Sequence, residues 1–157
     1  MAEENLFPED METLTIDEDE LIDEGETVIG YKKGVYFDDK TGDLLRDGNG
    51  SILESTPIEA WIQWCTKCIE TPRFQCPAYS SDIGINADEV RASITREAQE
   101  SMLYSEISEA LSADPYGRTS YVQYIEFDWT ASDTVDVSVI VVGIDGVPQE
   151  VNATIQV

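Results

Sequence analysis

Residues 135–157 read VDVSVIVVGIDGVPQEVNATIQV and carry the clearest structural pattern in the chain. Valine recurs at every second position from 135 to 141, which is the spacing of a strand with one buried face. Asp145-Gly146 then supplies a residue pair typical of a tight hairpin. From Val147 to Val157 apolar residues again alternate with polar ones. The run therefore predicts two antiparallel strands joined by a short turn.

A third strand precedes these two and completes a meander. Residues 121–129 place Tyr121, Ile125, Phe127 and Trp129 on one predicted face, and residues 131–133 form a turn before the valine run. The sequence closes with the last strand of the meander, so we expect that strand at the edge of the sheet.

The middle of the chain predicts helices. Thr56, Pro57 and Glu59 form a capping box with proline at the first helical position, and Pro72 ends that helix. Its apolar face consists of Ile58, Trp61, Ile62, Cys65, Cys68 and Ile69. We expect Asn86 to cap a short helix through Val90 and Ile94, followed by a longer one over 96–112. The buried stripe of the longer helix begins at Gln99 or Met102 and continues with Leu103, Ile107, Ala110 and Leu111.

The N-terminal part divides into a tail and a hairpin. Residues 34–38 predict a strand, 39–42 a turn and Leu44-Leu45 a short return strand, with a second turn at 47–50. The segment 1–26 holds twelve of the 33 acidic residues and no basic one, which predicts an acidic flexible tail that orders only against a neighbour. The sequence thus indicates one α+β domain over 27–157, with an N-terminal β-hairpin, two to three helices and a C-terminal three-stranded antiparallel meander.

Charge excludes several classes of partner. The net charge is −24, and charge of that sign repels nucleic-acid phosphates and anionic membrane surfaces. A basic protein partner fits it. We expect no membrane span, because no apolar stretch approaches the ~20 residues that one needs. We also expect no secretory signal, and three cysteines without an export signal indicate a reducing compartment.

No complete catalytic or metal-binding set is visible. Cys65 and Cys68 form a C-x-x-C, but they lie on the apolar face of a predicted helix and the chain has no histidine to complete a zinc site. The segment 47–51 resembles the start of a calcium loop, yet Ile52 and Ile58 occupy the positions that require glycine and glutamate. We therefore predict no catalytic residue, no metal and no cofactor.

The order and spacing of several segments resemble a known family. The segments are 36–44, Gly50, 60–63, 69–73, 79–84, 107–111, 121–129, 135–142 and Asp145-Gly146. Together they resemble the small baseplate proteins of PBSX-like prophages and R-type bacteriocins over roughly residues 28–150. That family is similar to the sheath initiators, or wedge proteins, of contractile phage tails.

The resemblance implies a structural, non-enzymatic role. Such a protein would join the wedge or hub of a baseplate to the first sheath ring and template sheath assembly. The implied partners are the tail sheath protein, baseplate wedge proteins and tail hub or tube proteins, with multiple copies in a symmetric ring. The implied location is the baseplate of a virion or tail-like particle, assembled in the host cytoplasm.

Two groups of residues are candidate contacts with partner proteins. In the wider family a Glu-Pro-Arg motif after the last helix docks on the wedge; here Asp114 and Pro115 stand at that place and Arg118 is displaced by two residues. The alternative is that Asp114 and Pro115 only end the helix. The last strand is the candidate for accepting a strand of the sheath protein, because main-chain hydrogen bonds at an open sheet edge give such pairing its affinity. Its candidate residues are Val151, Thr154, Ile155 and Val157.

Two rival functions remain open from sequence. Some relatives carry a legacy lysozyme-like label, which would make the chain a peptidoglycan hydrolase of the tail. An acidic DNA mimic that inhibits a nucleic-acid-binding protein is the second rival. A mimic would spread its charge over a folded surface, whereas much of the charge here falls in the segment 1–26.

Overall fold

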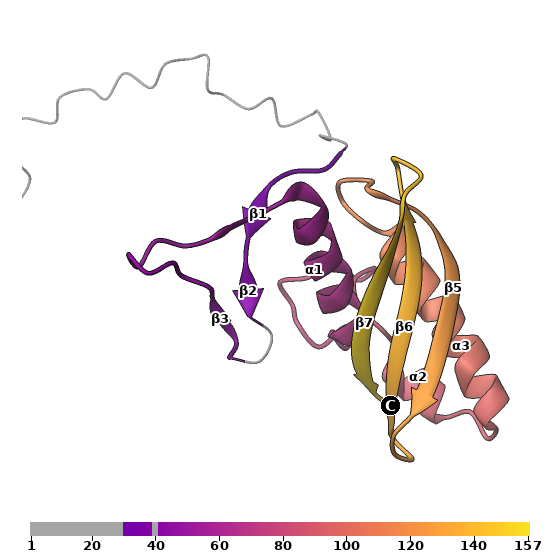
Figure 1. Cartoon of the computed structure of the whole chain (residues 1–157). Coiled ribbons are helices and arrows are strands. Elements are labelled where there is room, and N and C mark those ends of the chain that lie inside the picture. Colours follow the sequence, from indigo (N-terminus) through magenta and orange to yellow (C-terminus); the bar gives the residue numbers. More distant parts are fainter. Residues whose placement is uncertain (1–29, 39–40) are drawn as a thin grey trace, which may run out of the picture.

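A three-stranded sheet backed by helices forms the body of the protein. The computed structural model describes residues 30–38 and 41–157, so the predicted tail 1–26 lies outside the described residues. The strands β5 (Thr119–Trp129), β6 (Thr134–Gly143) and β7 (Pro148–Gln156) pair antiparallel in the order β5-β6-β7. Figure 1 shows α2 and α3 behind this sheet and α1 beside β7, with the front face of the sheet uncovered. The predicted α+β class and C-terminal meander are confirmed.

The register of the sheet follows the alternation in the sequence. Val135, Val137, Val139 and Val141 of β6 are all buried, and Val139 pairs with Ile125 on one side and Val151 on the other. The predicted hairpin at Asp145-Gly146 is also confirmed. Gly146 adopts a φ of 76°, a left-handed conformation that glycine accepts without steric cost.

One predicted face of β5 is wrong at its start. Tyr121 is 54 % exposed, whereas Val122 pairs with the buried Val141 and packs against the core. The register shifts between Val122 and Tyr124, which indicates a bulge in the strand. Because a bulge inserts an extra residue into one strand, it exchanges the two faces on either side of it.

The helices supply the other half of the core. α1 (Pro57–Glu70) begins with the predicted capping box of Thr56 and Glu59, and it packs on β7. α3 (Arg96–Ser112) packs on β5 through Leu103, Ile107, Ala110 and Leu111. The short α2 (Ala87–Arg91) ends three residues earlier than predicted, Asn86 makes no side-chain cap, and Ile94 is completely exposed rather than part of a helical face.

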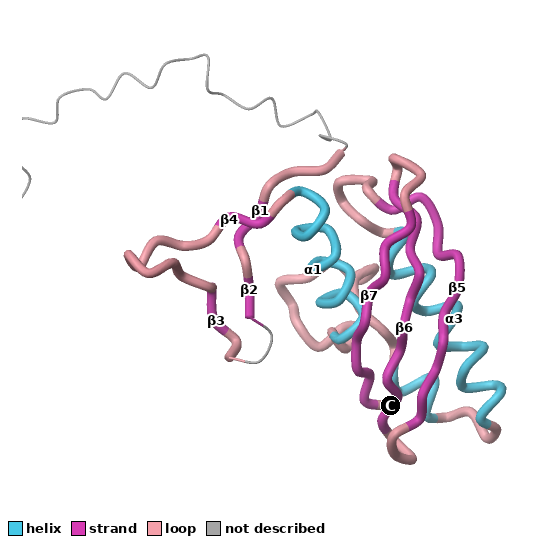
Figure 2. Tube along the Cα trace, viewed as in Figure 1, coloured by secondary structure: helices cyan, strands magenta, loops and turns pink. Residues whose placement is uncertain are grey.

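The N-terminal segment forms a small arm outside this body, as Figures 1 and 2 show. The predicted hairpin is present as β2 (Phe37–Asp38) paired with β3 (Asp43–Leu44). The predicted strand 34–38 is interrupted at Tyr36, however, because β1 (Gly34–Val35) pairs instead with β4 (Glu54–Ser55), a strand that the sequence did not predict. The turn at 47–50 is confirmed, with the Asp47 carboxylate accepting from the backbone N–H groups of Asn49 and Ser51.

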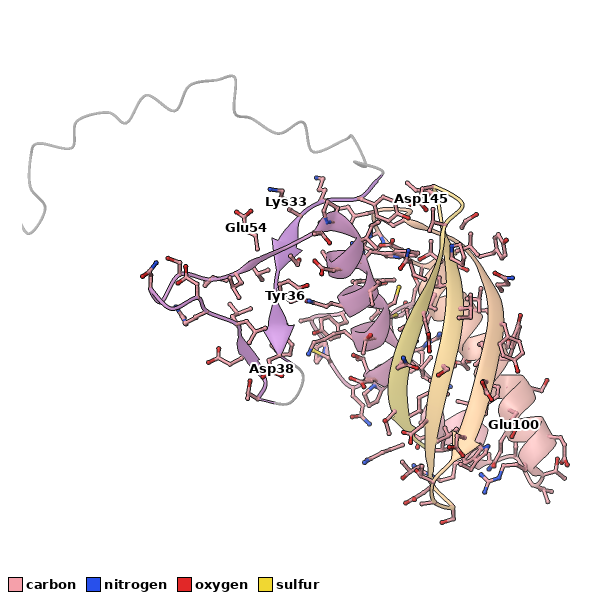
Figure 3. All side chains as sticks on the ribbon, viewed as in Figure 1. Lys33, Tyr36, Asp38, Glu54, Glu100 and Asp145 are labelled. Atoms are coloured by element: carbon pink, nitrogen blue, oxygen red, sulfur yellow. The ribbon has the colours of Figure 1, made fainter. Side chains whose placement is uncertain are left out.

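Specific contacts join the arm to the body. The Tyr36 hydroxyl donates to the Glu59 carboxylate on α1, and the Lys67 ammonium lies over the Phe37 ring. Figure 3 shows Tyr36 beside α1, with Lys33 just before β1 and Glu54 on the neighbouring β4. Tyr31 packs edge-on against Trp61 and donates to Asp145 of the β6–β7 turn. Gly143 leaves room for this contact, since a Cβ there would lie 1.9 Å from the Tyr31 hydroxyl oxygen.

Candidate protein-docking site

The outer edge of β7 is the candidate site, and the direction of its backbone groups defines it. Val157 N–H donates to Asp133 O, and Val147 O accepts from Gly143 N–H, so the odd-numbered residues turn their backbone toward β6. Thr154 N–H instead reaches Glu70, away from β6. Because backbone direction alternates along an antiparallel strand, the even-numbered residues from 148 to 156 turn their N–H and C=O groups to the outer edge.

The candidate residues of the last strand fall on two sides. Val151, Ile155 and Val157 are buried in the core, so they fix the strand in place, and of the three Ile155 also contributes to the lining of a hollow. Thr154 is exposed, and its hydroxyl donates to the Asp136 carboxylate 2.7 Å away on the uncovered face of the sheet. Of the four, Thr154 is therefore the one with both its side chain and its backbone N–H directed away from the core.

Glu70 is a residue of this site that sequence reasoning missed. It is the last residue of α1, and its carboxylate accepts from Thr154 N–H at 3.4 Å across 84 positions of sequence. A carboxylate at a helix C-terminus opposes the helix dipole. That unfavourable placement was a visible signal in the sequence, but nothing there connected it with residue 154.

Two hollows meet at Glu70 and Thr154. One, of about 540 Å³, lies on the uncovered sheet face and is lined by the carboxylates of Glu70, Glu126, Asp128 and Asp136 with polar neighbours. The other, of about 330 Å³, lies between the end of β7 and the loop after α1, and Ile69, Pro72, Ile85 and Ile155 contribute its aliphatic wall. Among the described residues, no lysine or arginine lines either hollow.

The second candidate contact, at 114–118, is largely internal. Asp114 and Arg118 are buried and pair with each other through two bonds of 2.8 Å, while Pro115 is exposed. The Asp114 carboxylate also accepts from the backbone N–H groups of Tyr116 and Arg118, and the Arg118 guanidinium lies near the rings of Trp64 and Tyr116. The pair thus shapes the loop between α3 and β5, and its docking role stays a prediction.

The cysteines are placed for packing. Cys65 and Cys68 are buried on α1, and burial raises the pKa of both thiols above its usual range, which disfavours the thiolate that metals and redox chemistry require. Within residues 30–38 and 41–157, no cluster of three or more carboxylate, cysteine or histidine side chains is arranged to hold a metal ion. None of the helices in the described part of the chain is long and apolar enough to cross a membrane.

Comparison with known proteins adds one match. The model of the family described as contractile injection system sheath initiator matches residues 33–146. The matched range includes the arm, the three helices, β5, β6 and the turn after them, and it stops before β7. No curated protein matches the chain.

Proposed function

Because the chain belongs to the sheath-initiator family of contractile injection systems, we propose that it joins a baseplate to the first sheath ring and that the outer edge of β7 templates the sheath. Family membership gives a structural role in a contractile injection system, and it implies contact with sheath and baseplate components. The family is not an enzyme family.

The observation that carries the β7 proposal is the direction of its even-numbered backbone groups. They point away from β6, and on that side β7 has no neighbouring strand among the described residues. A strand from another subunit can continue the sheet there with main-chain hydrogen bonds, while alternate side chains set its register. The family match ends before β7, so this part of the proposal rests on the geometry of the strand.

Thr154→Pro tests the proposal with little disturbance of the fold. Proline lacks a backbone donor, and at position 154 that donor points outward instead of into the pairing with β6. Pro148 already occupies an outward-facing position on the same strand. We expect the variant to fold, to join the baseplate and to leave it without a sheath in electron micrographs.

Two further variants serve as controls for the loss of the threonine side chain and for damage to the fold. Thr154→Ala keeps the backbone donor and should assemble sheath as the wild type does. Ile155→Pro removes a donor that faces β6 and should instead lower the melting temperature. Full-length sheaths on baseplates that carry folded Thr154→Pro would refute the β7 edge as the template, and the segment 114–118 would be tested next.

We also propose that the protein has no cell-wall hydrolase activity. The family is structural, and a hydrolase of the usual kind requires a pair of carboxylates on either side of a substrate cleft. Purified protein incubated with cell walls should leave their turbidity unchanged. Clearing of the walls that is lost on replacing one carboxylate would show the opposite.

A further inference from the structure

The two hollows beside β7 differ in chemistry, and they lie on opposite sides of the edge at Glu70 and Thr154. A strand added at this edge would direct successive side chains to opposite faces of the sheet. One set of side chains would therefore enter the hollow whose apolar lining comes from Ile69, Pro72, Ile85, Ala87 and Ile155. The other set would meet the carboxylate-lined face. Such an edge favours a strand in which aliphatic residues alternate with basic ones.

The carboxylate-lined face costs the free protein stability. Asp128 and Asp136 stand directly opposite each other on β5 and β6, and like charges in directly opposed positions are destabilising. Glu126 lies on the same face, two residues before Asp128. A strand added beside β7 would lie about 10 Å from β6 and about 14 Å from β5, because neighbouring strands are about 4.8 Å apart. Its cationic side chains would therefore contact Glu70 and attract the carboxylates of Asp136 and Asp128 at longer range, which favours a basic strand over a neutral one.

Glu70 at present occupies the edge donor that an incoming strand would need. Its bond to Thr154 N–H is 3.4 Å long, beyond the usual range for N–H···O bonds. Glu70 is exposed at the end of α1, so its side chain can turn without moving the helix. A lysine or arginine on the incoming strand offers the carboxylate a stronger, charge-assisted partner than the amide.

We propose that the β7 edge accepts an extended segment of a partner protein in which aliphatic and basic residues alternate, and that Glu70 exchanges its bond to Thr154 for a bond to one of the basic residues. This inference rests on the proposed function and names the chemistry of the strand that the edge receives. A second copy of this chain is a poor occupant, because each copy carries a net charge of −24. The chain's own segment 1–26, with twelve acidic residues and no basic one, is disfavoured for the same reason.

Synthetic strands test the proposal directly on the full chain. The probes are two blocked nonapeptides as long as β7, one alternating valine with lysine and the other alternating valine with glutamate. Titration calorimetry at low salt should detect binding of the lysine peptide alone. Amide exchange should slow at the even-numbered residues 150, 152 and 156 when it binds, and Thr154→Pro should abolish that effect.

Charge reversal at Glu70 separates this site from general attraction to an acidic protein. Glu70→Lys should weaken binding of the lysine peptide by about fivefold or more at low salt, with a smaller effect as salt screens the charges. Glu97→Lys is the matched control: it makes the same change at an exposed glutamate of α3, away from β7 and from both hollows, so it should weaken binding much less. Equal losses in the two variants would overturn the proposal.

Other outcomes distinguish this inference from the proposed function. Equal binding of both peptides would refute the preference for basic residues. A dimer of the free protein that Thr154→Pro dissociates, seen by analytical ultracentrifugation, would identify a second copy as the occupant. Either result leaves the sheath test of Thr154→Pro valid. Sheath growth on baseplates carrying that variant would instead refute the proposed function itself.

Discussion

Asp114 and Arg118 show how a single buried pair determines the course of a loop. The side chains are 1 % and 5 % exposed, and the guanidinium donates only to Asp114 among the hydrogen bonds of the described residues. The carboxylate has two further partners, the backbone N–H groups of Tyr116 and Arg118. The two residues therefore differ in what their removal costs. Removing Asp114 leaves a buried cation without a hydrogen-bond partner, whereas removing Arg118 leaves a carboxylate that keeps its backbone partners.

Asp114→Ala should destabilise the domain by about 3–5 kcal/mol, the usual cost of leaving one member of a buried pair without its partner. Arg118→Met should cost less, because its chain can refill the space beside Trp64 and Tyr116 while the carboxylate keeps its amide partners. Urea unfolding of both variants measures the difference. A larger loss for Arg118→Met than for Asp114→Ala would contradict this account of the loop.

Tyr31 makes the free energy of unfolding depend on pH in the alkaline range. Burial and the hydrogen bond to Asp145 raise the pKa of Tyr31 to about 12. The ordinary value is near 10. The folded state thus holds this proton more tightly than the unfolded chain. The stabilisation is complete below pH 10 and is lost as the pH rises from 10 to 12.

We expect Tyr31→Phe to reduce the loss of stability over that pH interval, since phenylalanine has no proton to release. Urea midpoints at pH 9, 10 and 11 would measure the slope for the wild type and the variant. Tyr121→Phe, which removes an exposed hydroxyl on β5, serves as the control. Parallel slopes for the wild type and Tyr31→Phe would show that the bond to Asp145 does not hold this proton.

Among the elements, α1 links several parts of the molecule: it packs on β7 and α3, contacts the arm, and ends at the candidate docking edge. Its beginning depends on the reciprocal bonds between Thr56 and Glu59.

Thr56→Ala should lower the stability of the domain by about 0.5–2 kcal/mol, the typical cost of losing an N-cap. Thr66→Ala makes the same chemical change in the middle of α1 and should cost less. Thermal unfolding followed by circular dichroism compares the two, and equal losses would mean that the cap contributes nothing.

Patterns among neighbouring residues predicted most elements. They failed where contacts between residues far apart in the sequence determine the structure. The valines of β6, the capping box of α1 and the Asp145-Gly146 hairpin are determined by neighbours in sequence, and all three are confirmed. The bulge in β5 was not predictable, because Tyr121 and Val122 are both acceptable strand residues and only packing selects Val122 for the core.

The candidate site was only partly visible in the sequence for the same reason. Thr154 could be placed on an outward face by simple alternation. The link from Glu70 to Thr154 spans 84 positions and depends on how α1 lies against β7. Likewise, Asp114 and Arg118 were expected at a surface, and only the fold shows that they are buried together.

At the scale of the whole molecule, the net charge of −24 opposes compactness. Like charges repel one another more when the chain is compact than when it is extended, and dissolved salt screens that repulsion. The melting temperature should therefore rise when sodium chloride is increased from about 10 mM to about 150 mM, over which range the screening length falls from about 30 Å to about 8 Å. A melting temperature that falls with added salt, measured by scanning calorimetry, would mean that specific ion pairs outweigh the general repulsion.

The buried thiols of α1 report how often this helix separates from the sheet. Cys65 and Cys68 are 0 % and 2 % exposed, whereas Cys76 is partly exposed in the loop that follows α1. A colorimetric thiol reagent can reach the two buried sulfur atoms only during moments when the helix separates from the sheet, so their labelling rate counts those openings. A ligand that binds only the closed form makes such openings rarer. Occupation of the β7 edge would therefore slow the labelling of Cys65 and Cys68 while Cys76 continues to react at its own pace.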